Sequence, residues 1–129
     1  MIMDEFERLL NEGDEAYIKD DYSKAILCYE DAFKLLTDEN KNKFQNTFPK
    51  MSRCYRQIGC PRSVIEMASE VKKRFGRNFI TSAFYTTIAA AYADVKEFGN
   101  AHRCIDEAKK LENGKVSKQL QMVIDRIEK

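Results

Sequence analysis

The sequence has few residues that interrupt or end helices. Its 129 residues include two prolines, five glycines, one histidine and no tryptophan. Long stretches of Ala, Leu, Glu, Lys and Ile therefore run without a break, and they lack the alternation of β-branched residues that is typical of strands. With 43% hydrophobic and 11% aromatic residues, the chain can build a core and is not predicted to be disordered. We expect one all-α domain of ordinary size.

Signals for export and for membrane insertion are also missing. The first residues, MIMDEFERLL, are acidic and lack both the positive start and the apolar run of a signal peptide. No segment approaches the ~18 consecutive apolar residues that a membrane-spanning helix needs. A cytoplasmic protein without membrane contact is the expectation from these absences.

The residue types that carry catalysis or bind metals are sparse. His102 is the only histidine, and Cys104 lies two positions away, where helical side chains do not face each other. There is no nucleophile at a recognisable spacing and no glycine-rich phosphate loop. Cys28, Cys54, Cys60 and Cys104 form no C-x-x-C pair, and we interpret them as reduced packing residues. We therefore expect no enzyme activity, no metal and no cofactor.

Turn signals divide the chain into seven expected helices. Asp20 or Asp21 can cap the second, and Pro49 predicts a kink or a late start within the third. Gly59 marks the break before the fourth helix, and Gly76 marks its end. The expected helices span residues 3–19, 22–36, part of 39–58, 61–75, 78–95, 98–111 and 116–127.

Three helical pairs align on one another. Superimposing Ala25, Val64 and Ala101 gives offsets of 39 and 37 residues between the units. Small residues then recur where two helices of a pair must approach closely, and larger residues lie between them. The first unit supplies Gly13, Tyr22, Ala25, Tyr29 and Ala32, and the third supplies Ala89, Tyr92, Phe98, Ala101 and Ala108.

This pattern resembles the tetratricopeptide repeat (TPR), a helix-turn-helix unit of about 34 residues. The second unit is degenerate, with Pro61 where an aromatic residue is usual and Val64 and Val71 at the small positions. The resemblance implies a right-handed α-solenoid of three hairpins, about residues 6–38, 42–76 and 79–113, followed by a capping helix at 115–128. We expect Leu120 and Ile124 of the capping helix to cover the sixth helix.

The family resemblance also implies a function and a surface. In tetratricopeptide proteins the first helix of each unit lines a concave groove that binds an extended peptide or a helix. The chain is therefore expected to be a non-enzymatic adaptor or small chaperone that binds a protein or peptide. The implied groove residues are Glu7, Leu10, Asp14 and Tyr17 in the first unit, Lys50, Arg53, Arg56 and Gln57 in the second, and Ala83, Thr86, Thr87, Ala90 and Asp94 in the third.

Charge is distributed unevenly along the chain. The net charge is −8 over residues 1–40, +8 over residues 41–77 and +1 over the remainder. Lys50, Arg53 and Arg56 are spaced three apart and share one helix face. They either pair with carboxylates of a ligand, or Arg53 and Arg56 bridge to the acidic first unit. Both interpretations follow from the pattern.

Other functions of such repeats have weaker support in the sequence, or none. One family subset grips a chaperone's terminal carboxylate, but at its binding positions this chain has Leu10, Asp14, Lys50, Ala83 and Thr87, of which only Lys50 is cationic. Small secretion chaperones of the family are similar in size, and nothing in the sequence selects them. Nucleic acid is disfavoured because the acidic segment repels phosphates. Head-to-tail self-association between the oppositely charged segments is the main alternative.

Overall fold

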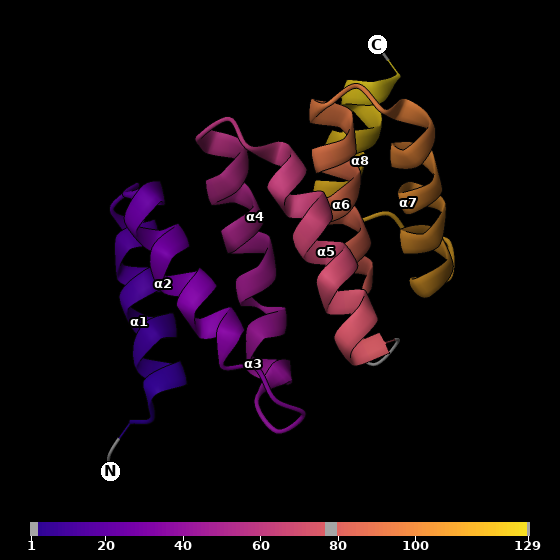
Figure 1. The fold of residues 1–129 in the computed structure, drawn as a ribbon. Coiled ribbons are helices and arrows are strands. Elements are labelled where there is room, and N and C mark those ends of the chain that lie inside the picture. The colour runs from indigo at the N-terminus through magenta and orange to yellow at the C-terminus, as the bar shows by residue number, and fades with distance from the viewer. Residues whose placement is uncertain (1–2, 77–79, 129) are drawn as a thin grey trace. The chain divides into compact units, whose positions relative to one another are not determined.

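The computed structural model describes residues 3–76 and 80–128, and the regular structure in these ranges is α-helical without strands (Figure 1). The prediction of an all-α chain is confirmed. Its contacts divide it into two compact units, Met1–Cys60 (unit 1) and Pro61–Lys129 (unit 2). The helices are α1 Glu5–Ile18, α2 Tyr22–Lys34, α3 Lys41–Gln45, α4 Thr47–Gln57, α5 Pro61–Phe75, α6 Ser82–Asp94, α7 Phe98–Leu111 and α8 Lys118–Ile127.

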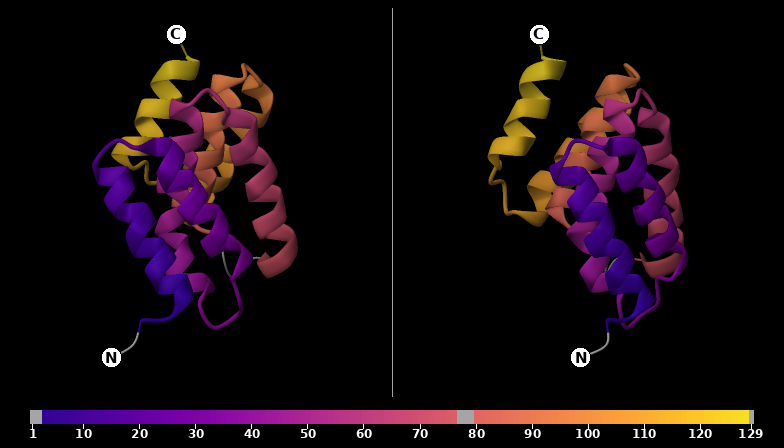
Figure 2. Two further views of the ribbon diagram at one scale, coloured as in Figure 1. Left: turned by 60° about the vertical axis from the view of Figure 1, so that its left-hand side comes forward. Right: turned by 90° about the vertical axis from the view of Figure 1, so that its left-hand side faces the viewer.

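In unit 1, α1 and α2 form a helical hairpin, and α4 packs on α2 (Figures 1 and 2). Asp4 caps α1 by accepting the Glu7 N–H, and Asp21 caps α2 by accepting the Lys24 N–H at 3.3 Å. Capping by Asp21 is one of the two predicted alternatives. The unit's core is built from large side chains of α1 to α4, including Phe6, Leu9, Ile26, Tyr29, Phe44, Phe48 and Met51.

The third predicted helix is broken before Pro49, as its sequence indicates. α3 ends at Gln45 and α4 begins at Thr47, so Pro49 is the third residue of α4. The first N–H groups of a helix have no intrahelical acceptor, and a proline there removes no hydrogen bond. The prediction of a late start is confirmed.

The α1 and α2 helices meet most closely at Gly13. A Cβ atom added there would lie 2.4 Å from Cε1 and 2.7 Å from Cδ1 of Tyr29. Tyr29, Ala25 and Ala32 are fully buried. The predicted pattern of small residues around a large one therefore matches the packing of this hairpin.

Ser52 occupies the position in α4 that aligns with Gly13. It is only 2% exposed, and its Oγ has no hydrogen-bond partner among the described residues. Leaving a buried hydroxyl unsatisfied costs about 1–3 kcal/mol. We expect Ser52→Ala to raise the free energy of unfolding by about 1 kcal/mol, measured by urea denaturation. A loss of stability would mean that the hydroxyl has a partner in solution.

In unit 2, α6 and α7 form a second hairpin with small residues at its centre. Ala89, Ala101 and Ala108 are fully buried there. α5 has the predicted bounds, and Gly76 follows it with φ +63°, the left-handed conformation expected after a helix. α6 begins at Ser82 because the Thr81 side chain caps it. The predicted start at residue 78 lies outside the described residues.

α8 packs on the α6 and α7 hairpin, chiefly on α6. Leu120 and Val123 are buried in a cluster with Ala89 and Ala90 of α6 and with Ile105 and Ala108 of α7. Leu120 therefore covers α7, the sixth predicted helix, as expected. The main contact of α8 is with α6, which the sequence did not predict. The predicted second hairpin falls on both sides of the division between the units, since α4 belongs to unit 1 and α5 to unit 2.

The four cysteines are free, and three fit the predicted packing role. Cys28 and Cys54 are buried and Cys104 is half-buried, whereas Cys60 is exposed. The packing interpretation is wrong for Cys60 because this residue lies in the turn between α4 and α5, where its side chain meets solvent. In the described residues, no helix has both the length and the apolar character needed to cross a membrane.

Candidate functional site

The face of unit 1 formed by α1 and α4 brings four charged residues together in two pairs. Lys50 Nζ lies 3.3 Å from Asp14 Oδ1, and Lys43, in α3, is paired with Glu7. Each pair joins residues 36 positions apart. Both pairs are partly exposed, so their stabilisation is modest, typically below about 1 kcal/mol each. Their effect is to connect the acidic α1 to the basic segment that follows α2.

Asp14 has a second role inside the hairpin. Its Oδ1 accepts a hydrogen bond from the Tyr29 hydroxyl at 2.6 Å. Burial, followed by this bond, raises the pKa of Tyr29 well above its ordinary value. Asp14 therefore holds a core tyrosine and Lys50 at once, and we infer that it is less available to a ligand than the groove prediction implies.

The raised pKa of Tyr29 predicts a loss of stability at alkaline pH. The hydroxyl donates only while protonated, so its contribution is complete below the unfolded pKa of about 10 and is lost as pH rises above that value. Tyr29→Phe should lower the free energy of unfolding by about 1 kcal/mol near pH 7. The difference from the unchanged protein should shrink as pH rises above about 10. Parallel stability curves for the two proteins would contradict this role.

Beside these pairs, Arg53 is exposed and forms no ion pair with any residue in the described ranges. Its charge acts on Tyr22, whose pKa is raised mainly by a hydrogen bond from the hydroxyl to Asp20 at 3.1 Å and is lowered in part by Arg53. The Tyr22 ring meets the Tyr17 ring edge to face, with centroids 6.3 Å apart. We call Tyr17, Tyr22 and Arg53 the Tyr/Arg patch.

Sequence reasoning identified two members of the Tyr/Arg patch and missed the third. The repeat pattern predicts a packing role for Tyr22, which aligns with Phe98 near a hairpin turn, yet its side chain is half-exposed. Tyr22 directly follows Asp21, the cap of α2, and is therefore the first residue of that helix. A side chain at this end of a helix can remain near solvent. Among the other predicted residues of this unit, Leu10 is buried, Glu7 and Arg56 are half-buried, and Gln57 is exposed.

The groove residues predicted for the third repeat lie in α6 of unit 2, and most of them already have partners or are buried within that unit. Thr86 and Thr87 donate hydrogen bonds to the carbonyl groups of Ser82 and Ala83 in the preceding turn of α6. Thr86 and Ala90 are buried, whereas Ala83 is exposed and Thr87 half-buried.

Asp94, at the C-terminal end of α6, accepts a hydrogen bond from Arg126 of α8 at 2.6 Å. α8 therefore covers the end of the predicted surface that includes Ala90 and Asp94. Ala83 and Thr87, one turn apart near the start of α6, are the members of this set that a ligand can reach.

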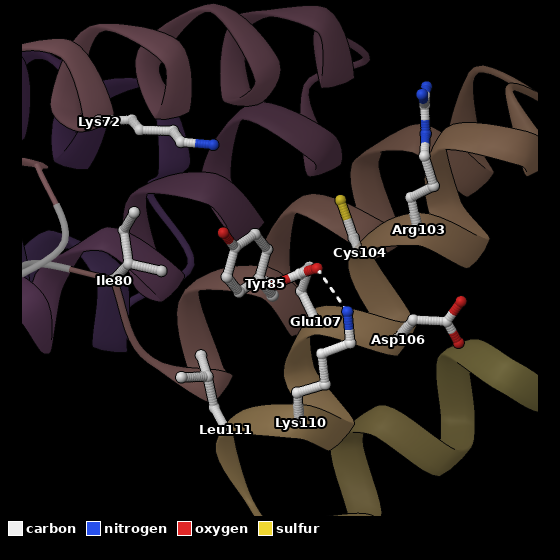
Figure 3. A pocket seen from close by; sticks show the side chains of 9 residues that line it. All are labelled: Lys72, Ile80, Tyr85, Arg103, Cys104, Asp106, Glu107, Lys110 and Leu111. Atoms are coloured by element: carbon white, nitrogen blue, oxygen red, sulfur yellow. Dashed lines mark hydrogen bonds and ion pairs between the residues drawn. The ribbon is translucent and has the colours of Figure 1, made fainter.

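Unit 2 also has a pocket that the sequence did not predict. It has a volume of about 830 Å³ and lies between the C-terminal end of α5, residue Ile80, the start of α6 and one side of α7 (Figure 3). Ile80, Tyr85 and Leu111 form its apolar part. Lys72 and Arg103 contribute positive charges, and Lys110 pairs with Glu107 at 3.3 Å. The pocket was missed because it forms between segments that are distant in sequence.

The thiol of Cys104 also lines this pocket. Burial raises the pKa of the Cys104 thiol to about 11, although Arg103 and Lys72 act in the opposite direction. At neutral pH the thiol is therefore protonated and a poor nucleophile. In the described part of the chain, no group of three or more His, Cys, Asp or Glu side chains is placed to hold a metal ion.

Comparison with known proteins gives no significant match to a protein-family model, a curated protein or a solved structure. The tetratricopeptide resemblance accordingly stays a prediction from the sequence.

Proposed function

We propose that the chain is a non-enzymatic, tetratricopeptide-like interaction module of the cytoplasm, an adaptor or small chaperone. In this proposal its hairpins belong to a right-handed solenoid, and the α1 and α4 face of unit 1 binds an acidic peptide or helix. The observation that carries the proposal is the Tyr/Arg patch. Arg53 is exposed and has no ion-pair partner in the described ranges, while Lys43 and Lys50 of the same unit are paired.

The residue types in the patch suit protein recognition. Arginine and tyrosine are enriched among interface residues that contribute most to binding, since they combine apolar area with directed hydrogen bonds. A guanidinium group can hold a carboxylate through two parallel hydrogen bonds, and a hydrogen bond to a charged group contributes about 1.5–3 kcal/mol. The Tyr17 and Tyr22 rings already contact each other, so part of the patch is in place before a ligand binds, which reduces the entropy lost on binding.

Peptide selection tests this proposal directly. A random peptide library displayed on phage is selected on the immobilised protein, and recovered peptides are titrated by fluorescence anisotropy. We expect enrichment of peptides rich in Asp and Glu, with an affinity that falls as salt rises. Arg53→Glu should weaken the binding of these peptides by about tenfold or more, because a charge-assisted contact becomes a repulsion.

The matched control is Lys24→Glu, the same reversal at an exposed residue of α2 in the same unit. It should leave the affinity within about twofold, since it changes net charge equally but lies outside the patch. Equal effects of both substitutions would show a non-specific charge effect. Unchanged binding by Arg53→Glu, with a lowered melting temperature, would show that Arg53 only stabilises the fold.

A further inference from the structure

The unit 2 pocket has the chemistry of a docking site for a second protein surface. Its apolar part, Ile80, Tyr85 and Leu111, is bordered by the cations Lys72, Arg103 and Lys110 and by two carboxylates, Asp106 and Glu107, of which Glu107 pairs with Lys110 (Figure 3). Lys72 extends from α5 toward the Tyr85 ring, and Arg103 lies on the opposite side on α7. Neither cation forms an ion pair within the described ranges. A complementary partner therefore offers an apolar side chain with carboxylates around it.

Unit 1 of the same chain displays such a feature. Ile18, the last residue of α1, is 80% exposed, more than any other large hydrophobic side chain in the described ranges. Glu15, Asp20 and Asp21 lie within three residues of it and are exposed, and Lys19 is the one cation among them, so residues 15–21 carry a net charge of −2. An apolar side chain with carboxylates beside it complements an apolar pocket with free cations at its rim, in the pattern of an interface with an apolar centre and a polar edge.

We infer that the unit 2 pocket of one copy binds the Ile18 end of α1 from a second copy. Ile18 contacts Tyr85 and Leu111, and the carboxylates beside it meet Lys72 and Arg103. Because the two surfaces differ, each copy keeps one of them free, and the contact is head-to-tail and repeats along an open chain of copies. This contact borders the Tyr/Arg patch, since Ile18 follows Tyr17 in the chain and Asp20 accepts a hydrogen bond from the Tyr22 hydroxyl.

Charge complementarity sets the direction of this contact. Residues 1–40, which include Ile18, carry a net charge of −8. α5 ends with the three basic residues Lys72, Lys73 and Arg74, next to the pocket. Attraction between exposed charges weakens with ionic strength, since the Debye length falls from about 30 Å at 0.01 M to about 3 Å at 1 M salt. Association is therefore favoured at low salt.

Sedimentation equilibrium tests the inference. At low salt and rising concentration, the average mass should increase beyond the monomer's 15.0 kDa and beyond that of a dimer. Ile18→Gln and the double variant Lys72→Glu, Arg103→Glu should each weaken association by at least about tenfold. Leu27→Gln, a change at a side chain that is 66% exposed on α2, and the pair Lys115→Glu, Lys118→Glu are the controls that should associate normally.

Mixing the two disabled proteins gives the decisive result. The Ile18→Gln copy retains an intact pocket, and the Lys72→Glu, Arg103→Glu copy retains an intact Ile18. An equimolar mixture should form a one-to-one dimer that grows no further, because only one functional interface remains. An unchanged protein that stays monomeric at low salt, a mixture without dimer, or controls that also abolish association would overturn the inference.

Discussion

Replacing Gly13 with alanine should destabilise the protein by about 2 kcal/mol, a fall in melting temperature of roughly 8 °C. The added methyl group would overlap the Tyr29 ring, with Cβ 2.4 Å from Cε1. Tyr29 has no room to yield, because it is fully buried and its hydroxyl is bound to Asp14. Thermal denaturation followed by circular dichroism measures the change.

The matched control is Gly99→Ala, the same substitution in α7 at a position where an added Cβ meets nothing within 4 Å. Alanine favours helix over glycine by about 0.5–1 kcal/mol, so this variant should be slightly more stable than the unchanged protein. Combining Gly13→Ala with Tyr29→Phe should cost less than the sum of the two changes, since the ring is then free to shift. A stabilising Gly13→Ala would refute the close approach of α1 to α2.

Leu120→Ala should cost about 3 kcal/mol, the larger of the two predicted losses. Leu120 is 1% exposed and packs with Val123 against Ala89 and Ala90 of α6. Alanine at position 120 leaves a cavity that these small neighbours are poorly able to fill. Urea denaturation should show the loss, and amide hydrogen exchange should show faster exchange along α8.

Met122→Ala is the control on the same helix. Met122 is 60% exposed, so its truncation should change the free energy of unfolding by less than about 0.5 kcal/mol. Equal effects of the two substitutions would contradict the assigned orientation of α8. A small effect at Leu120 alone would mean that α8 is not held on α6 in solution.

The helix boundaries could be predicted from the sequence because the interactions that set them involve residues only a few positions apart. Asp21 accepts an N–H three residues later, Gly76 adopts the left-handed conformation, and Pro49 lies in a first turn. Helix periodicity likewise placed Phe98 at the start of α7. The starts of α1, α6 and α8 are later than predicted, because each helix begins directly after a residue whose side chain caps it: Asp4, Thr81 and Ser117.

The candidate site depended on contacts between distant segments, which the sequence pattern does not specify. Spacing placed Lys50 and Arg53 on one face of a helix, but only the fold shows that Lys50 pairs with Asp14 while Arg53 lies near Tyr22. The amphipathic pattern of α8 predicted that Leu120 is buried. It did not predict that Arg126 reaches Asp94 of α6. The pocket around Tyr85 likewise forms between segments that are distant in sequence.

We propose that the Tyr/Arg patch in unit 1 binds an acidic peptide. Nuclear magnetic resonance of the ¹⁵N-labelled protein, titrated with a selected acidic peptide, tests it most directly. We expect chemical-shift changes to concentrate at Tyr17, Tyr22 and Arg53 and to disappear in the Arg53→Glu variant. Shift changes confined to other helices, with those three signals unmoved at saturation, would contradict it.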